Sequence, residues 1–181
     1  MNDIKYGIFF DNGISGACCI LNLNNDEEVY YFEMPTFKVS ASAKTKKGEG
    51  YITRIDHKKL YNRINKIIGD NKAIAILERM MQNPGRFKNS ISAARAFEST
   101  LVVLENLNIS YEEIDSRTWQ HALFEKGTKG REQLKLASLH LSQKLFPQFH
   151  AEIQSHTDGD SFLIGYYYKQ KILQERNSNG K

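Results

Sequence analysis

The sequence is short of the features that mark secreted and membrane proteins. It has two cysteines in 181 residues, and they are neighbours, Cys18 and Cys19. On a strand, adjacent side chains point to opposite faces, so these two are not expected to bridge each other, and no C-x-x-C spacing for a metal exists. No apolar run approaches the roughly 18 residues of a membrane helix, and no signal-peptide pattern opens the chain. We therefore expect a cytoplasmic protein with reduced thiols and no membrane contact.

What the chain does have is an ordinary globular composition with an uneven charge. Hydrophobic residues make up 40% and charged residues 25%, which suits one domain, expected over 1–176 with a disordered tail at 177–181. The net charge is only +4, yet residues 38–66 contain nine lysines and arginines against two acids. Such a patch suits a polyanion, although a solvated basic loop is the alternative.

The stretch from Tyr6 to Leu21 organises the rest of the chain. An apolar run ends in Asp11, an Asn12-Gly13 pair predicts a tight turn with positive φ angles, and a second apolar run follows. Asp11 would lie at the tip of a strand with two apolar faces. A bare carboxylate there costs free energy unless a cation meets it. The alternative is that Asp11 caps its own turn.

The remaining pattern predicts further strands and helices. The expected strands cover 4–10, 15–23, 28–34, 72–77 and 109–114, and the expected helices begin at Asp56 and near Ser90 or Ser92, then cover 116–124, 132–146 and the residues after Asp160. Residues 36–53 are predicted as a mobile basic loop. One helical face is predicted as core, with a dimer seam as the alternative; it consists of Ala94, Phe97, Leu101 and Leu104.

A second strand, 72–77, also ends in a carboxylate, Glu78. Because it follows a helix, it should run parallel to the first strand, and if the two are neighbours, the backbones at Asp11 and Glu78 lie roughly 5 Å apart. Asp158 and Asp160 open the last helix and are expected to join them. Taken singly, Glu78 is better explained as a surface carboxylate, and Asp158 or Asp160 as a helix N-cap; it is their occurrence at converging positions that favours a site.

Several carboxylates in one place repel each other unless divalent cations bind them, and all-oxygen ligation favours Mg²⁺ or Mn²⁺. Two such ions, about 3.5–4 Å apart, clamp both the attacking and the leaving oxygen of a phosphodiester displacement. The scaffold that brings these acids together is an α/β, ribonuclease-H-like fold. We expect its five-stranded mixed sheet, three antiparallel strands plus two parallel, to be flanked by helices.

Five sequence blocks, spread over nearly the whole chain, resemble those of RuvC-type Holliday junction resolvases, particularly small phage-borne ones. They are Phe10-Asp-Asn-Gly-Ile-Ser-Gly-Ala17, Ala75-Ile-Leu-Glu78, Asp115-Ser-Arg-Thr-Trp-Gln120, Lys135-Leu-Ala-Ser138 with Lys144-Leu-Phe-Pro147, and Asp160-Ser-Phe-Leu-Ile-Gly165. The resemblance implies that Asp11, Glu78 and Asp160 hold two Mg²⁺ or Mn²⁺ ions. For the fourth ligand the family commonly has Asp, sometimes His, at the position of Thr157; Asp158 is our first choice and His156 the second.

The resemblance also implies a surface for branched DNA. Lys129, Arg131 and Lys135 match basic residues near the family's site, expected to hold the scissile phosphate, although Lys135 is equally explained as an exposed helix residue. The basic segment would contact the DNA backbone, with Lys44, Lys46, Lys47 and Arg54 as its main candidates. An apolar wedge that unstacks bases would come from Met81 or from Phe87, which Arg86 and Lys88 flank.

The function implied is a metal-dependent endonuclease that resolves four-way or branched DNA junctions in recombination, repair or phage genome processing. A homodimer with one site per protomer would match the twofold symmetry of a junction and make paired nicks that leave 5′-phosphates. Two alternatives stay open. One is a junction-binding relative that has lost the metals. The other is an actin-like ATPase or sugar-kinase domain, which would need a second phosphate loop.

Overall fold

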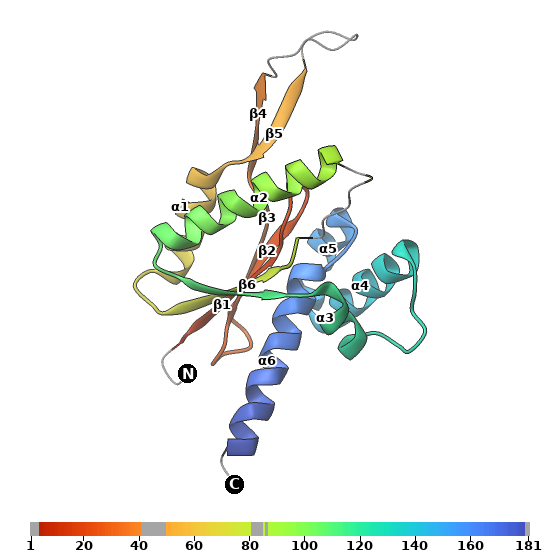
Figure 1. Cartoon of the computed structure of the whole chain (residues 1–181). Helices are drawn as coiled ribbons and strands as arrows, with labels where there is room; N and C mark the ends of the chain where they lie inside the picture. Colours follow the sequence, from red (N-terminus) through yellow and green to blue (C-terminus); the bar gives the residue numbers. More distant parts are fainter. Residues whose placement is uncertain (1–3, 41–49, 81–84, 86, 180–181) are drawn as a thin grey trace.

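The computed structural model describes residues 4–40, 50–80, 85 and 87–179, and it contains the predicted five-stranded mixed sheet (Figure 1). The strands lie in the order β3-β2-β1-β6-β7. β1 pairs antiparallel with β2, and β2 antiparallel with β3, whereas β6 runs parallel to both β1 and β7. The predicted set of three antiparallel strands plus two parallel strands is therefore confirmed.

The elements have the following bounds. The strands are β1 Tyr6–Asp11, β2 Ala17–Asn22, β3 Val29–Glu33, β4 Thr36–Ser40, β5 Tyr51–Ile55, β6 Ala73–Glu78 and β7 Ser110–Ile114. The helices are α1 His57–Ile68, α2 Phe87–Asn106, α3 Ser116–Leu123, α4 Arg131–Leu145, the 3-10 turn η2 Pro147–Phe149, α5 His150–His156 and α6 Asp160–Asn179.

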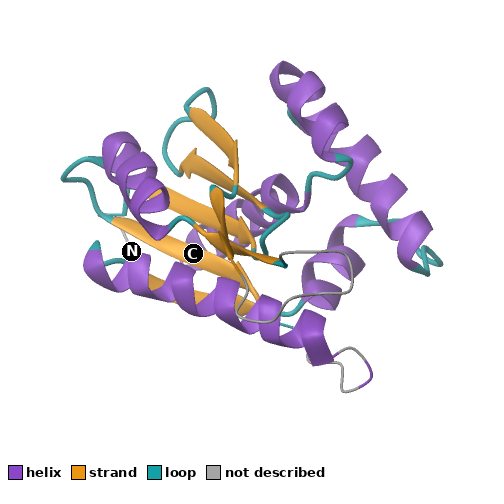
Figure 2. Cartoon of the chain, turned by 90° about the horizontal axis from the view of Figure 1, so that it is seen from above, coloured by secondary structure: helices purple, strands orange, loops and turns teal. Residues whose placement is uncertain are grey.

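Helices cover the sheet on both faces, and each face has its own apolar core (Figure 2). The core under α1 and α2 includes Phe10 and Cys18, and the core under α6 includes Phe9 and Cys19. The two cysteines thus point to opposite faces and are both free thiols, as the alternation along a strand predicts. The buried indole of Trp119 ties α3 to the α6 core.

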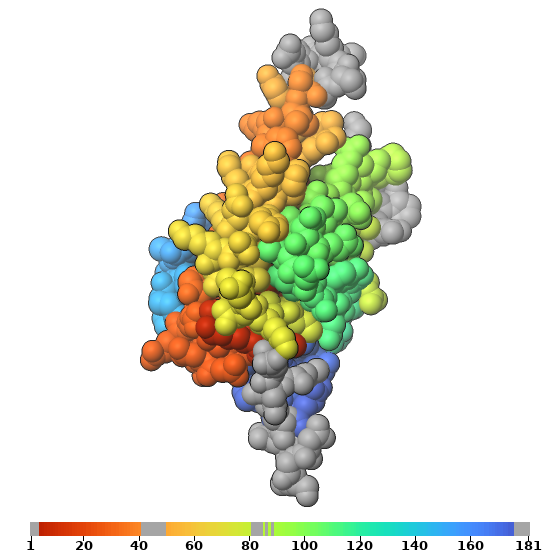
Figure 3. All heavy atoms as spheres, turned by 90° about the vertical axis from the view of Figure 1, so that its left-hand side faces the viewer, coloured from red at the N-terminus to blue at the C-terminus, as the bar shows by residue number. Residues whose placement is uncertain are grey.

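Most of the α2 face that is predicted to belong to the core packs against it. Leu104 is fully buried, and Phe97 and Leu101 pack against the α1–α2 core. Ala94 is exposed and is the exception. Figure 3 shows α1 and α2 side by side on this side of the molecule.

The loop prediction for residues 36–53 is wrong at both ends. β4 and β5 form an antiparallel hairpin that pairs Thr36 with Ile55 and Ser40 with Tyr51, while residues 41–49 lie outside the described part. The hairpin projects from the body, so its strands lack the buried face whose period-2 pattern would have revealed them (Figures 1 and 3).

The C-terminal boundary also differs from the prediction. Helix α6 continues to Asn179, so residues 177–179 are helical and not part of a disordered tail, and 180–181 are outside the described residues. Among the residues that the structure describes, no helix has both the length and the apolar character needed to cross a membrane.

Candidate metal centre

The ends of β3, β1 and β6 place three carboxylates in one row across the sheet, with the start of β2 between β3 and β1. In the ladders, Asp11 pairs with Ala17 and Ala17 pairs with Glu33, and the parallel β1–β6 register brings Glu78 next to Asp11. Directly paired residues project from the same face of a sheet. Phe9, two residues before Asp11, lies in the α6 core, so all three carboxylates face α6. The predicted convergence of the ends of β1 and β6 is confirmed.

The turn after β1 differs from the predicted one. Neither Asn12 nor Gly13 has a positive φ angle, because the turn spans several residues and closes through Gly16, whose N–H donates to the Gly13 carbonyl at 3.2 Å. Asn12 Oδ1 accepts a hydrogen bond from Thr100 Oγ1 at 3.0 Å, which ties the turn to α2. Within the described residues, no hydrogen bond joins the Asp11 side chain to this turn, so it does not act as the turn's cap.

Gly16→Ala should destabilise the protein by about 2 kcal/mol or more, because its new Cβ would lie 1.9 Å from the backbone oxygen of Asp11. The matched control is Gly13→Ala. A Cβ there meets nothing within 4 Å, so this substitution should be neutral or stabilising by up to about 1 kcal/mol through the unfolded chain. Urea unfolding of both variants measures the difference. Equal stability of the two would contradict the close packing of the turn.

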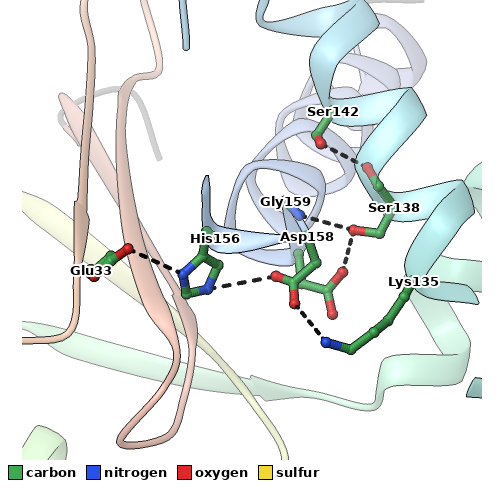
Figure 4. A network of polar contacts seen from close by, with 8 residues as sticks. Glu33, Lys135, Ser138, Ser142, His156, Asp158 and Gly159 are labelled. Carbon is green, nitrogen blue, oxygen red and sulfur yellow. Dashed lines mark hydrogen bonds and ion pairs between the residues drawn. The ribbon is translucent and has the colours of Figure 1, made fainter. Parts of the chain in front are cut away.

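The acids of the last helix are fixed by a corner between α5 and α6. Thr157 ends α5 in a left-handed conformation, with φ of 70°. Gly159 is buried so tightly that a Cβ would lie 2.1 Å from Ser142 Oγ. Ser138 on α4 accepts the N–H of Gly159 at 3.1 Å and donates its hydroxyl to Asp160 Oδ1 (Figure 4). Helix α4 therefore holds Asp160 in place.

Asp158 lies between a lysine and a histidine (Figure 4). Its Oδ2 is 3.6 Å from Lys135 Nζ, and its Oδ1 is 3.7 Å from His156 Nε2. That Oδ1 atom is buried and accepts no hydrogen bond from any described residue. A buried acceptor without a partner is costly, and a bound cation would satisfy it.

Burial and the mutual proximity of the carboxylates raise the pKa values of three acids in the cluster. Burial, followed by the charges of Asp160, Glu78 and Asp158, raises the pKa of Asp11 well above its usual range. Burial and then the charge of Asp160 raise the pKa of Glu78 to about 7. Burial raises the pKa of Asp160 to about 6, against the opposing hydrogen bond from Ser138. The deprotonated form of each of these three carboxylates is therefore disfavoured unless a cation binds nearby.

The donor atoms suit a divalent ion. One ligand atom each from Asp11, His156 and Asp158 lies within 4.8 Å of the others. Ligands of one ion at about 2.1 Å lie about 3 to 4 Å apart, so a small movement closes this set around a metal. Both candidates for the fourth ligand thus face Asp11. Glu78 and Asp160 lie beside this group: the charge of Asp160 helps to raise the pKa of Glu78, and the charge of Asp158 helps to raise the pKa of Asp160.

The structure separates the predicted DNA-contacting residues into several places. Arg54 is exposed on β5, and Phe87 is 70% exposed at the first position of α2, open to a large ligand. Lys129 and Arg131 are exposed just before and at the start of α4, two turns or less from Lys135. Lys88 lies in α2. Outside the described residues are Lys44, Lys46, Lys47, Met81 and Arg86.

Sequence reasoning missed Glu33, which ends β3 on the same row as Asp11. The signal was present, since the third strand also finishes on a carboxylate. It missed Ser138 as well, because a serine on an amphipathic helix gives no sign that it will hold Asp160.

Of three comparisons with known proteins, the one with solved structures supports the fold. No family model matches the chain, and no curated protein matches its sequence. The structure of T. thermophilus RuvC in complex with a Holliday junction substrate is similar, with a TM-score of 0.51 and 8% identity over 92% of this chain and 96% of that chain. A second structure of Thermus thermophilus RuvC gives a TM-score of 0.47 and 11% identity over the same shares, 92% and 96%. The chain has the ribonuclease-H-like fold of RuvC.

Proposed function

We propose that this protein is a divalent-metal-dependent endonuclease that nicks four-way or branched DNA. One observation carries the proposal: at the carboxyl end of β1 in a RuvC-like sheet, Asp11 meets His156 and Asp158 with ligand atoms within 4.8 Å of one another. The similar RuvC structure holds a Holliday junction substrate, which supports the choice of DNA as ligand.

Each residue of the site has a proposed role in metal binding or phosphate binding. Asp11, Asp158 and His156 would hold the ions, proposed to be two Mg²⁺ or Mn²⁺, with Glu78 and Asp160 completing the acidic cluster. Bound ions would activate the attacking water and stabilise the leaving 3′ oxygen. Lys135, whose Nζ lies 3.6 Å from Oδ2 of Asp158, would hold a non-bridging oxygen of the scissile phosphate. Ser138 keeps Asp160 in one orientation through its hydrogen bond.

The projecting β4–β5 hairpin extends the surface available to DNA. Lys38 and Arg54 are exposed on its two strands, and cations on a projecting pair of strands suit contacts with phosphates. Of the two predicted wedge residues, Phe87 lies within the described part of the chain. It is exposed at the start of α2, and we propose that it stacks on unpaired bases. We further propose a homodimer, because a four-way junction has two equivalent strands to cut. The biological setting would be recombination, repair or phage genome processing.

The geometry of the donor group gives less support to the two alternatives. A relative without metals was suggested by the open question of the fourth ligand, and His156 and Asp158 both lie in the donor group. A phosphate-binding ATPase domain requires a second phosphate loop, which the sequence does not supply.

A cleavage assay tests the proposal. A synthetic four-way junction labelled on each strand is incubated with the protein and Mg²⁺, with Mn²⁺ in parallel, and a linear duplex of the same sequence serves as the control. We expect symmetric paired nicks with religatable 5′-phosphate ends in the junction and an uncut duplex.

Two other outcomes argue against it. Junction binding without cleavage in either metal would favour the non-catalytic alternative. No binding to branched DNA would refute the proposal and revive the phosphate-binding alternative.

A further inference from the structure

Glu33, a carboxylate that is not among the proposed metal ligands, contacts one of those ligands, His156. Glu33, at the end of β3, has its Oε1 atom 3.7 Å from Nδ1 of His156. The other ring nitrogen of His156, Nε2, lies 3.7 Å from Oδ1 of Asp158. The imidazole therefore lies between two carboxylates, one on the sheet and one at the α5–α6 corner (Figure 4).

The surroundings restrict how this ring can turn. The His156 side chain is only 8% exposed, and the ring of Tyr31 meets it edge-on at 6.3 Å between centroids. Tyr31 is in turn stacked on Phe162, at 4.7 Å and 16° between ring planes. Because β3 carries both Tyr31 and Glu33 on the α6 face, one strand supplies the wall and the polar partner of the imidazole.

We propose that Glu33 is a positioning residue that accepts the Nδ1–H of His156 and so holds the Nε2 lone pair toward Asp11 and Asp158, ready for a metal ion. A neutral imidazole has one N–H and one lone pair, and the hydrogen bond at one nitrogen decides which tautomer is present. An acceptor at Nδ1 is the usual means by which proteins orient a histidine ligand.

The distances fit this role. The contact of 3.7 Å is longer than a hydrogen bond of about 2.9 Å, and the Glu33 side chain, 65% exposed, has the freedom to close it. On the other side of the ring, Nε2 and the unpartnered Asp158 Oδ1 face each other at 3.7 Å, a spacing that a shared ion would bridge. Without Glu33, the acceptor that remains beside the ring is Asp158 Oδ1, which favours the proton on Nε2 and so removes the lone pair that a metal ion needs.

The inference rests on the proposed metal site, whereas its first test uses metal-free protein and does not depend on metal binding. In metal-free protein at pH 8, long-range ¹H–¹⁵N NMR distinguishes the two imidazole tautomers. We expect wild-type His156 to be the Nδ1–H form and Glu33→Ala to shift it toward the Nε2–H form. Glu33→Gln, whose amide oxygen still accepts, should keep the wild-type tautomer. An Nε2–H tautomer in the wild type would overturn the proposal.

Metal affinity supplies the second test. Mn²⁺ binding, measured from the loss of the free-ion EPR signal, should weaken about 10-fold in Glu33→Ala and stay within about twofold of wild type in Glu33→Gln. Glu152→Ala is the matched control, because Glu152 is an exposed acid on α5 that lines the same surface hollow as Glu33, a cavity of about 700 Å³. It should leave Mn²⁺ affinity unchanged.

A double-mutant comparison separates positioning from general charge. In a His156→Ala background, Glu33→Ala should weaken Mn²⁺ binding no further, because there is no ring left to orient. A 10-fold loss in that background, or an equal loss in Glu152→Ala, would show that Glu33 acts only as a negative charge and would overturn the proposal. If wild-type protein binds no Mn²⁺, the proposed function fails, and the tautomer measurement still decides the Glu33 contact.

Discussion

Asp11→Asn should abolish junction cleavage and at the same time make the metal-free protein more stable. The amide cannot replace an anionic ligand, so we expect the cleavage rate to fall by about 1,000-fold or more, equivalent to about 4 kcal/mol. The gain in stability, on the order of 1 kcal/mol, follows from the crowding of the site. Burial and the charges of Asp160 and Glu78 raise the pKa of Asp11 well above its usual range, and a neutral side chain removes that repulsion.

The opposite signs of the two effects make this experiment informative. Cleavage is followed on the labelled junction, junction binding by gel shift without metal, and stability by urea unfolding at pH 8. Asp70→Asn is the matched control, since Asp70 is exposed in the connection between α1 and β6 and should change none of the three. Cleavage retained by Asp11→Asn would refute a metal role for Asp11. Lost cleavage with lost stability would indicate misfolding instead.

The sheet and the positions of Asp11 and Glu78 follow from local sequence rules. The run before Asp11 is apolar on both faces because β1 is the central strand, with cores above and below it. Helix α1 directly precedes β6, as expected of a crossover into a parallel strand, and β6 runs parallel to β1 and ends beside it. The same rules place Asp160 at the start of α6, where an acid is favoured.

The rest of the site and the β4–β5 hairpin depend on tertiary contacts that local sequence patterns do not predict. His156 and Asp158 face the same point because Thr157, a residue with a Cβ, adopts φ of 70° between them, and tertiary packing imposes this conformation. Glu33 becomes relevant only when α5 packs near the end of β3. The β4–β5 hairpin escapes detection because its strands bury little, so burial does not impose an alternating pattern.

Glu78→Gln should be more stable than the wild type at pH 8 and equally stable at pH 4, provided that no divalent metal is present. The pKa of Glu78 is raised to about 7 in the folded protein, from an ordinary value near 4.5. The folded state therefore keeps this proton while the unfolded chain has lost it, so Glu78 costs stability progressively as pH rises from about 4.5 to about 7. Removing the charge recovers up to about 3 kcal/mol at pH 8.

Divalent metal should reverse the order, because the ion binds the deprotonated carboxylate and its affinity rises with pH. With saturating Mg²⁺ or Mn²⁺ at pH 8, the wild type should gain more stability than Glu78→Gln, as urea unfolding at pH 4, 6 and 8 with and without metal will show. Glu28→Gln gives a contrast of opposite sign. Hydrogen bonds from Tyr6 and Asn22 lower the pKa of Glu28, so its stabilisation is present at pH 8 and is lost as pH falls. A Glu78→Gln variant that is less stable than the wild type in metal-free buffer at pH 8 would contradict this prediction. It would mean that the neighbouring carboxylates do not destabilise the Glu78 anion, and that the site does not need a cation to offset repulsion.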